Sequence, residues 1–149
     1  VVHYHLGLAH WLQGDFTAAE CAWLDCLAVV RNDEARVAVT HWLWCARMRR
    51  GDPAGAAAVV LPITAAMDVV ENRSYHQLCL LYGGKVRVEE ITPLAGSAGS
   101  ALGFGVAHHA LVTGDRERAR TQLRELAASP GWPAFGVIAA EAELVRQAW

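Results

Sequence analysis

The side chains that could carry chemistry are scattered along this sequence and do not form a recognisable motif. Seven histidines occur, and His3 and His10 are spaced so that they could share one face of a helix. A zinc site needs further ligands, and neither an HExxH pattern nor a Cys/His cluster accompanies this pair. We therefore interpret the histidines as packed or hydrogen-bonded imidazoles and predict no metal. A zinc site is the alternative.

The acidic residues and glycines also lack a catalytic arrangement. Nothing in the sequence pairs the candidate acids for general acid and base roles; they are Glu20, Asp25, Glu141 and Glu143. Gly103-x-Gly105 is too short for a phosphate-binding loop and has no matching strand. These glycines would instead let a neighbouring helix or a ligand approach closely. The sequence therefore predicts a protein that is not an enzyme and that uses no cofactor.

Composition narrows the class of partner. Hydrophobic residues make up 54% of the sequence, above the roughly 45–50% that is usual, which favours association with a partner or with a second copy. The net charge is -2 and no basic block occurs, which argues against nucleic acid. The arginine-rich stretch 116–124 is interpreted as a solvated face, with contact to an anionic group as the alternative. No apolar run reaches the roughly 20 residues of a membrane-spanning helix.

The cysteines and the start of the chain give weaker indications. The four cysteines form no CxxC pair, and they are Cys21, Cys26, Cys45 and Cys79. We interpret them as buried free thiols, which favours a reducing, cytoplasmic compartment. The sequence opens without methionine inside a helical pattern, which indicates a fragment or a processed form.

The elements that must position these side chains are marked by a recurring Gly-Asp pair. It stands at Gly14-Asp15, Gly51-Asp52 and Gly114-Asp115, and Gly83-Gly84 occupies the intermediate place. Glycine can take the left-handed conformation that ends one helix, and aspartate can cap the amides that begin the next. A period of about 33 residues between apolar helical runs predicts a stack of helical hairpins.

Apolar residues at three- and four-residue steps predict about nine helices in antiparallel pairs and no strands. The main helices are expected over residues 1–13, 15–30, 34–50, 53–61, 71–83, 101–113, 115–128 and 133–149. A short helical piece is expected over 64–70. Another is expected over 85–92, where Val86, Val88 and Ile91 alternate as in a strand but Glu89-Glu90 favour a helix. Pro93 would stop this helix. Residues 96–100 are predicted to form a loop because they are mainly glycine and serine.

The first pair of predicted helices resembles a tetratricopeptide repeat. That family's signature is W-x2-L-G-x2-Y, then A-x3-F, then proline, over 34 residues. The corresponding residues here are His3-x2-Leu6-Gly7-x2-His10 and then Ala19-x3-Trp23. Arg31 stands where proline is expected. Later pairs keep the small or apolar positions at Leu43, Ala56, Ala107 and Ala119-x3-Leu123, with Pro130 near the expected proline.

The resemblance implies an all-α, right-handed α-α superhelix in a single domain over 1–149. Its repeats would cover residues 1–32, 33–70, 71–97 in degenerate form, and 98–131, followed by a terminal helix over 132–149. Such repeats stack because one hairpin cannot bury its apolar face alone, and the stack leaves an extended concave groove. Residues 83–105 fit the pattern least, and we expect any functional distortion there.

The family's groove-facing positions, carried over to this sequence, define the expected binding site. They are Tyr4, His5, Leu8, Trp11, His41, Trp42, Tyr75, Phe104 and His108, with Cys45 and Leu78 beside them. Such a groove is aromatic and rich in histidine, and it lacks the lysine and asparagine set with which some family members hold a peptide's terminal carboxylate. An extended apolar or aromatic segment is therefore the expected ligand. The alternative is that these rings only pack inside the protein.

Two functions are expected. The first is a protein-binding scaffold that holds a protein or peptide partner in its groove. The second is a structural protein whose apolar ends stack between copies into oligomers or filaments, because solenoids without polar ends tend to associate.

Overall fold

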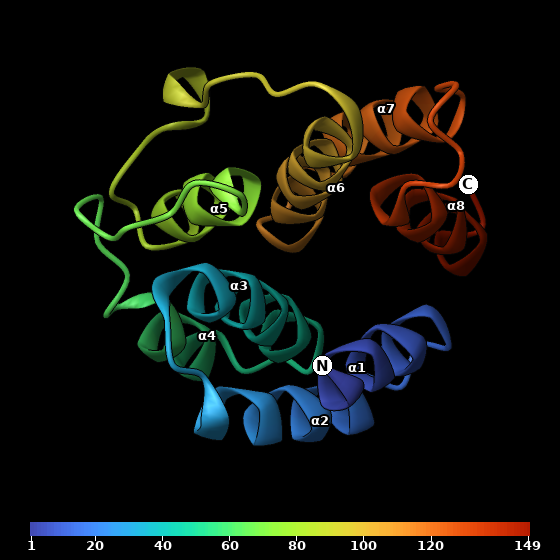
Figure 1. Ribbon diagram of the computed structural model, residues 1–149. Helices are drawn as coiled ribbons and strands as arrows, with labels where there is room; N and C mark the ends of the chain where they lie inside the picture. Colours follow the sequence, from blue (N-terminus) through green and yellow to red (C-terminus); the bar gives the residue numbers. More distant parts are fainter. The chain divides into compact units, whose positions relative to one another are not determined.

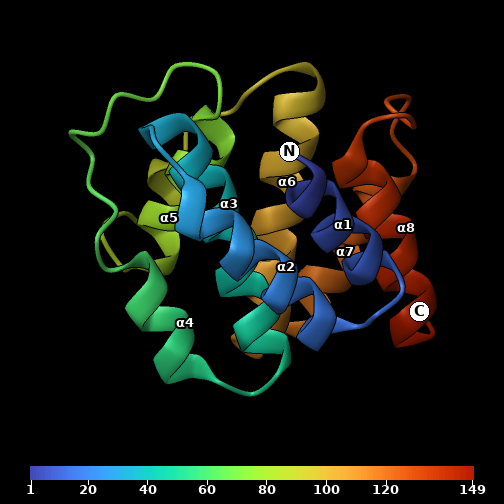
Figure 2. The same cartoon turned by 60° about the horizontal axis from the view of Figure 1, so that its bottom comes forward.

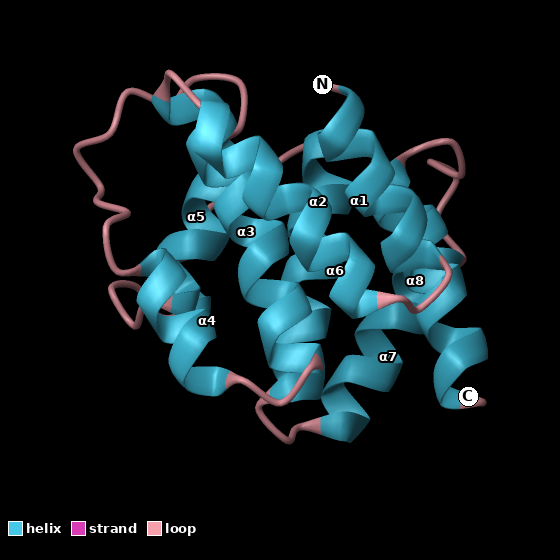
Figure 3. Cartoon of the chain, turned by 90° about the horizontal axis from the view of Figure 1, so that it is seen from below, coloured by secondary structure: helices cyan, strands magenta, loops and turns pink.

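The computed structural model describes residues 1–149, and every regular element is helical (Figures 1 and 3). Eight α-helices and one 3-10 turn are present without any strand, so the predicted all-α class is confirmed. The elements are α1 (Val2–Leu12), α2 (Phe16–Val29), α3 (Asp33–Arg49), α4 (Pro53–Val60), α5 (Arg73–Tyr82), η1 (Val88–Glu90), α6 (Gly96–Val112), α7 (Arg116–Ala127) and α8 (Phe135–Gln147). None of the helices combines the length and apolar character needed to cross a membrane.

The Gly-Asp pairs end one helix and begin the next, as predicted. Gly14, Gly51 and Gly114 have φ values of 78°, 74° and 101°, in the left-handed region that glycine enters without a Cβ penalty. The aspartate after each glycine accepts a hydrogen bond from an amide in the first turn of the next helix, namely the amides of Ala18, Gly55 and Arg118. Gly84 also has a positive φ of 69°, but no aspartate follows it and no α-helix begins there.

The chain divides into two compact units, Val1–Arg87 and Val88–Trp149. We call them unit 1 and unit 2. In unit 1, α2 packs against α1 and α3, and α3 also packs against α4 and α5 (Figure 2). In unit 2, each of the three helices α6, α7 and α8 packs against the other two.

Three tryptophans from three helices form the core of unit 1. Trp11, Trp23 and Trp42 are almost fully buried, and the Trp23 and Trp42 rings stack with centroids 5.4 Å apart. The Trp23 indole lies against Gly7, where a Cβ would come within 2.2 Å of Trp23 Nε1. The glycine therefore lets α1 and α2 approach closely enough to bury the indole.

A buried carboxylate joins α2 to the end of α3. Glu20 accepts a hydrogen bond from Arg47 Nε at 2.8 Å and also pairs with Arg50. Arg47 Nη1 in turn donates to the carbonyl of Gly55 in α4 at 2.9 Å. Burial alone would raise the pKa of Glu20, but the hydrogen bonds and charges of the two arginines outweigh burial and lower that pKa. Glu20 is thus an ion-pair partner in the packing of unit 1.

Glycine also allows a close helix contact in unit 2. A Cβ on Gly136 of α8 would lie 2.3 Å from the carbonyl oxygen of Ser100 in α6, so a larger residue would push the two backbones apart. Small and apolar side chains supply much of this core, and the fully buried ones include Ala107, Ala119, Leu123, Val137, Ala139 and Ala140.

The short helix predicted over 64–70 is absent, and this prediction was wrong. Carboxylates from the start of α3 bind the amides of this stretch instead. Asp33 accepts from the amide of Asp68 at 3.0 Å, and Glu34 accepts from the amides of Val70, Glu71 and Asn72. An amide bound by a side chain is not available to a helical carbonyl, which explains the turns observed here.

The prediction of a loop over 96–100 was also wrong, because α6 begins at Gly96. Gly96 has a φ of 62°, and a Cβ on Gly99 would lie 2.2 Å from the carbonyl oxygen of Leu94. These glycines therefore allow the preceding segment to pass close to the helix. The helix predicted over 85–92 is reduced to the three-residue turn η1, and the predicted total of about nine becomes eight α-helices and this turn.

Candidate functional site

Four of the side chains predicted to line a groove meet inside unit 1. The Trp42 Nε1–H donates to the hydroxyl of Tyr4 at 3.1 Å, and burial, together with the neighbouring Tyr75 side chain, raises the pKa of Tyr4. The His41 and Tyr75 rings have centroids 4.9 Å apart. Helices α1, α3 and α5 thus bring these residues into one aromatic network.

Tyr82 extends this network, although it was not among the residues predicted to line the groove. Its hydroxyl lies 2.9 Å from His41 Nδ1, and the Cys45 sulfur is 4.0 Å from that hydroxyl and from both nitrogens of the His41 ring. Burial raises the pKa of the Cys45 thiol and of the Tyr82 hydroxyl well above their ordinary values. A thiol that stays protonated is not a nucleophile. We therefore interpret the contacts among Cys45, His41 and Tyr82 as packing contacts of the core.

Most of the predicted groove residues lie in the interior. Trp11, His41 and Trp42 are buried in unit 1. Phe104 and His108 are buried in α6 of unit 2, with ring centroids 5.8 Å apart. The less buried members are Tyr4, Leu8 and Tyr75, which are half-buried, and His5, which is exposed.

Two of the predicted residues, Tyr4 and His5, line a cavity of unit 1. Its volume is about 270 Å³, and the other lining residues are Val1, Cys26, Ala35, Ala38, Val39 and Asn72. The Tyr4 hydroxyl is already bonded within the network, and His5 Nδ1 donates to the carbonyl of Val1 at 3.0 Å. The cavity is smaller than the roughly 300–1,000 Å³ of most ligand sites, and the Tyr4 hydroxyl and His5 Nδ1 at its edge already have partners within the protein.

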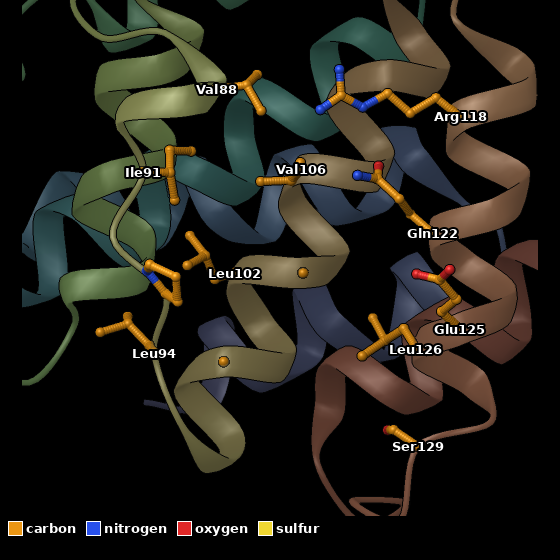
Figure 4. Close-up of a pocket in the computed structure, with 13 residues that line it drawn as sticks. Val88, Ile91, Leu94, Leu102, Val106, Arg118, Gln122, Glu125, Leu126 and Ser129 are labelled. Atoms are coloured by element: carbon orange, nitrogen blue, oxygen red, sulfur yellow. The ribbon is translucent and has the colours of Figure 1, made fainter.

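A larger groove crosses α6 in unit 2, and we call it the α6–α7 groove (Figure 4). Its volume is about 500 Å³. The floor is one face of α6, formed by Gly99, Leu102, Gly103 and Val106. One wall is the segment before α6, with Val88, Ile91, Pro93 and Leu94. The other wall is α7 and the turn after it, with Arg118, Gln122, Glu125, Leu126 and Ser129.

The two walls of the α6–α7 groove differ in chemistry. The floor and the first wall are apolar, whereas Arg118 and Gln122 extend from α7 toward α6 (Figure 4). The Oε1 atom of Gln122 and the Oγ atom of Ser129 are shielded from solvent and have no hydrogen-bond partner in the protein. Such unpaired buried oxygens cost free energy. A bound molecule that presents N–H groups would satisfy them.

None of the nine predicted groove residues lines the α6–α7 groove. Gly103, which the sequence indicated as a place of close approach, does lie in its floor, and a Cβ there would be 3.8 Å from the Leu126 side chain. The α7 wall lies within and just beyond the arginine-rich stretch that was interpreted as solvated. The three- and four-residue spacing of its polar residues, from Arg118 to Ser129, is the signal that could have identified it.

Neither a metal-binding cluster nor a known relative identifies a site in this protein. No three side chains of His, Cys, Asp or Glu lie together in a way that could hold a metal ion. No protein-family model matches the sequence, and no curated protein and no solved structure shows significant similarity to it.

Proposed function

We propose that this protein is a tetratricopeptide-like scaffold that binds an extended apolar segment of another protein in the α6–α7 groove. The observation that carries the proposal is the composition of the groove, in which an apolar floor and wall face a polar wall with two unpaired oxygens. Apolar surface supplies the driving force for such binding, and a few placed polar groups fix the orientation of the ligand. The proposed site thus differs from the aromatic residues selected from the sequence.

The small residues support the tetratricopeptide-like part of the proposal. Gly7 and Ala19, at two signature positions, are both buried, and Trp23, at an aromatic position, packs against Gly7. Ala56, Ala107 and Ala119 are also fully buried. In the proposed architecture the helical pairs follow one another in a right-handed superhelix that keeps a groove accessible to a partner.

The proposal is tested by filling the groove. A library of displayed peptides is selected on the full chain, and the affinities of the selected peptides are measured by fluorescence anisotropy. Gly103→Met adds a side chain to the floor, and its Cβ would meet nothing closer than 3.8 Å, so we expect the fold to be retained. Peptides that bind in the groove should lose at least about tenfold in affinity, because the added side chain occupies their space.

Thr121→Met is the matched control. Thr121 is exposed on α7 and does not line the groove, so the same side chain there should leave binding unchanged. Selected peptides that bind Gly103→Met as tightly as the parent protein would rule out the groove as the site. A selection that yields no binding peptide would rule out the scaffold function.

Self-assembly is the second candidate function, and exposed apolar side chains favour it. Val2 and Leu6 of α1 are 78% and 45% exposed, and Val145 of α8 is 82% exposed. A second copy could cover these side chains. Light scattering should then show a mass that rises with concentration, and Leu6→Glu combined with Val145→Glu should abolish that rise. A constant monomer mass in the parent protein would exclude this candidate.

A further inference from the structure

We infer that the segment bound in the α6–α7 groove carries one acidic and one basic side chain about three residues apart, the acid for Arg118 and the base for Glu125. This inference rests on the proposed function and specifies the chemistry of its ligand. Both residues line the same wall of the groove, and both are exposed. Neither forms an ion pair within the protein.

The spacing follows from the geometry of α7. Arg118 and Glu125 are seven residues apart on one helix, which is about two turns or about 10 Å. An extended chain in the polyproline II conformation advances about 3.1 Å per residue and has three residues per turn, so two side chains three residues apart span about the same distance and point to the same side. A helical ligand uses its main-chain N–H groups within the helix, whereas an extended chain leaves them free to donate to the unpaired Gln122 Oε1 atom. The extended ligand is therefore the one that fits.

The charges of this wall are placed against the dipole of their own helix. A helix favours acidic residues near its first turn and basic residues near its last turn. Arg118 is in the first turn of α7 and Glu125 is in the last, which is the opposite arrangement. Glu117 and Arg124, outside the groove, follow the favourable order. Positions that break a local rule in this way are expected at functional sites.

Arg116, another cation at the start of α7, has partners within the protein. Its guanidinium lies 5.0 Å from the centre of the Trp149 ring and donates to Gln147 Oε1 at 3.2 Å. Arg118 has no such side-chain partner, and it extends toward the groove instead (Figure 4). A carboxylate of the ligand would supply the missing partner, and the Glu125 carboxylate would receive a lysine or arginine in the same way.

Gln122 lies between the two charges and completes the match. It is four residues after Arg118 and three before Glu125, so it occupies the same face of α7. Its buried Oε1 atom has no partner in the protein, and a main-chain N–H of the extended ligand can donate to it. The wall therefore presents, in order, a cation, an acceptor for the main chain and an anion.

Double-mutant cycles with the peptides from the groove selection test this inference. We expect those peptides to be enriched in an acid and a base three residues apart. Arg118→Gln is combined with neutralisation of the peptide acid, and Glu125→Gln with neutralisation of the peptide base. Each matched pair should show a coupling of about fivefold in affinity, because the second neutralisation removes a contact already lost. Mismatched pairs should show none.

Glu117→Gln and Arg124→Gln are the controls, because they neutralise the neighbouring residues outside the groove and should not couple to the peptide. If peptides still lose affinity on Gly103→Met but show no coupling to Arg118 or Glu125, the charge inference is overturned and the groove function stands. If Gly103→Met has no effect, the groove function itself fails. Selected peptides whose charges are absent or of one sign would also overturn the inference.

Discussion

At the scale of single residues, two glycines in helices should respond in opposite directions to the same change. Gly7→Ala would place a methyl group 2.2 Å from Trp23 Nε1 in the buried core, and we expect it to destabilise the protein by about 1–3 kcal/mol. Gly103→Ala meets only ordinary contacts at 3.8 Å and should stabilise it by up to about 1 kcal/mol through helix propensity. Urea unfolding measures both. Equal effects of the two changes would contradict this account of Gly7.

The pKa of His109 depends on the charge of Arg118 even when no ligand is bound. Burial lowers the pKa of His109, and the positive charge of Arg118 lowers it further. Arg118→Gln should therefore raise this pKa toward the ordinary value of about 6.5, as measured by NMR titration of the imidazole. Arg124→Gln is the control and should leave the pKa of His109 unchanged.

The same shift in His109 has a consequence for stability. Its folded pKa lies below the unfolded value, so the unfolded chain binds the proton more readily. Stability is then lost as pH falls from about 6.5 through the folded pKa. The Arg118→Gln variant should lose less stability over this range, as measured by urea unfolding at several pH values. An identical loss in parent and variant would show that Arg118 does not act on His109.

At the scale of elements, α7 should be more stable with its groove charges exchanged. Arg118→Glu with Glu125→Arg places both charges in the order that the helix dipole favours, and each exchange should contribute about 0.3–1 kcal/mol. The same exchange at Glu117 and Arg124 reverses a favourable order and should destabilise by a similar amount. Urea unfolding compares the two double variants. Changes of the same sign would argue against the dipole account.

The helices that a short sequence pattern specifies were predicted well. Each Gly-Asp pair contains within two residues the backbone freedom and the capping oxygen that a helix junction needs, so the junctions at Gly14, Gly51 and Gly114 could be predicted. The turns over 64–70 could not, because they depend on Glu34, which lies far away in the sequence. The start of α6 at Gly96 was missed because glycines that permit close packing resemble loop residues.

The candidate site was harder to predict for the same reason. The positions taken from the resemblance include side chains that do meet in space, such as Tyr4, Trp42 and Tyr75. Most of the nine predicted groove residues are nevertheless buried, and their burial depends on tertiary packing that the sequence pattern does not show. The α6–α7 groove combines a segment and two helices that have no shared motif. Of its residues, Gly103 was singled out from the sequence for its size, and Arg118 only as part of the arginine-rich stretch 116–124.

At the scale of the whole molecule, the chain has two compact units whose boundary follows Arg87. Between α5 and α6 the only regular structure is the turn η1. We expect brief digestion with trypsin to cleave first after Arg87, which is exposed, and mass spectrometry should then find fragments 1–87 and 88–149. First cleavage within α3 or α6 would contradict this division. The superhelix and the single-domain organisation remain predictions.

The carboxylates of Asp33 and Glu34 bind the stretch 68–72 in a way that does not depend on its side chains. They hold Asp68, Val70, Glu71 and Asn72 through backbone amides, which every residue except proline supplies. The side chains of Asp68, Val70 and Glu71 are exposed. These three positions can therefore vary over evolution, or carry a label or an engineered epitope, while the loop keeps its path. Proline is the one substitution that each of them excludes.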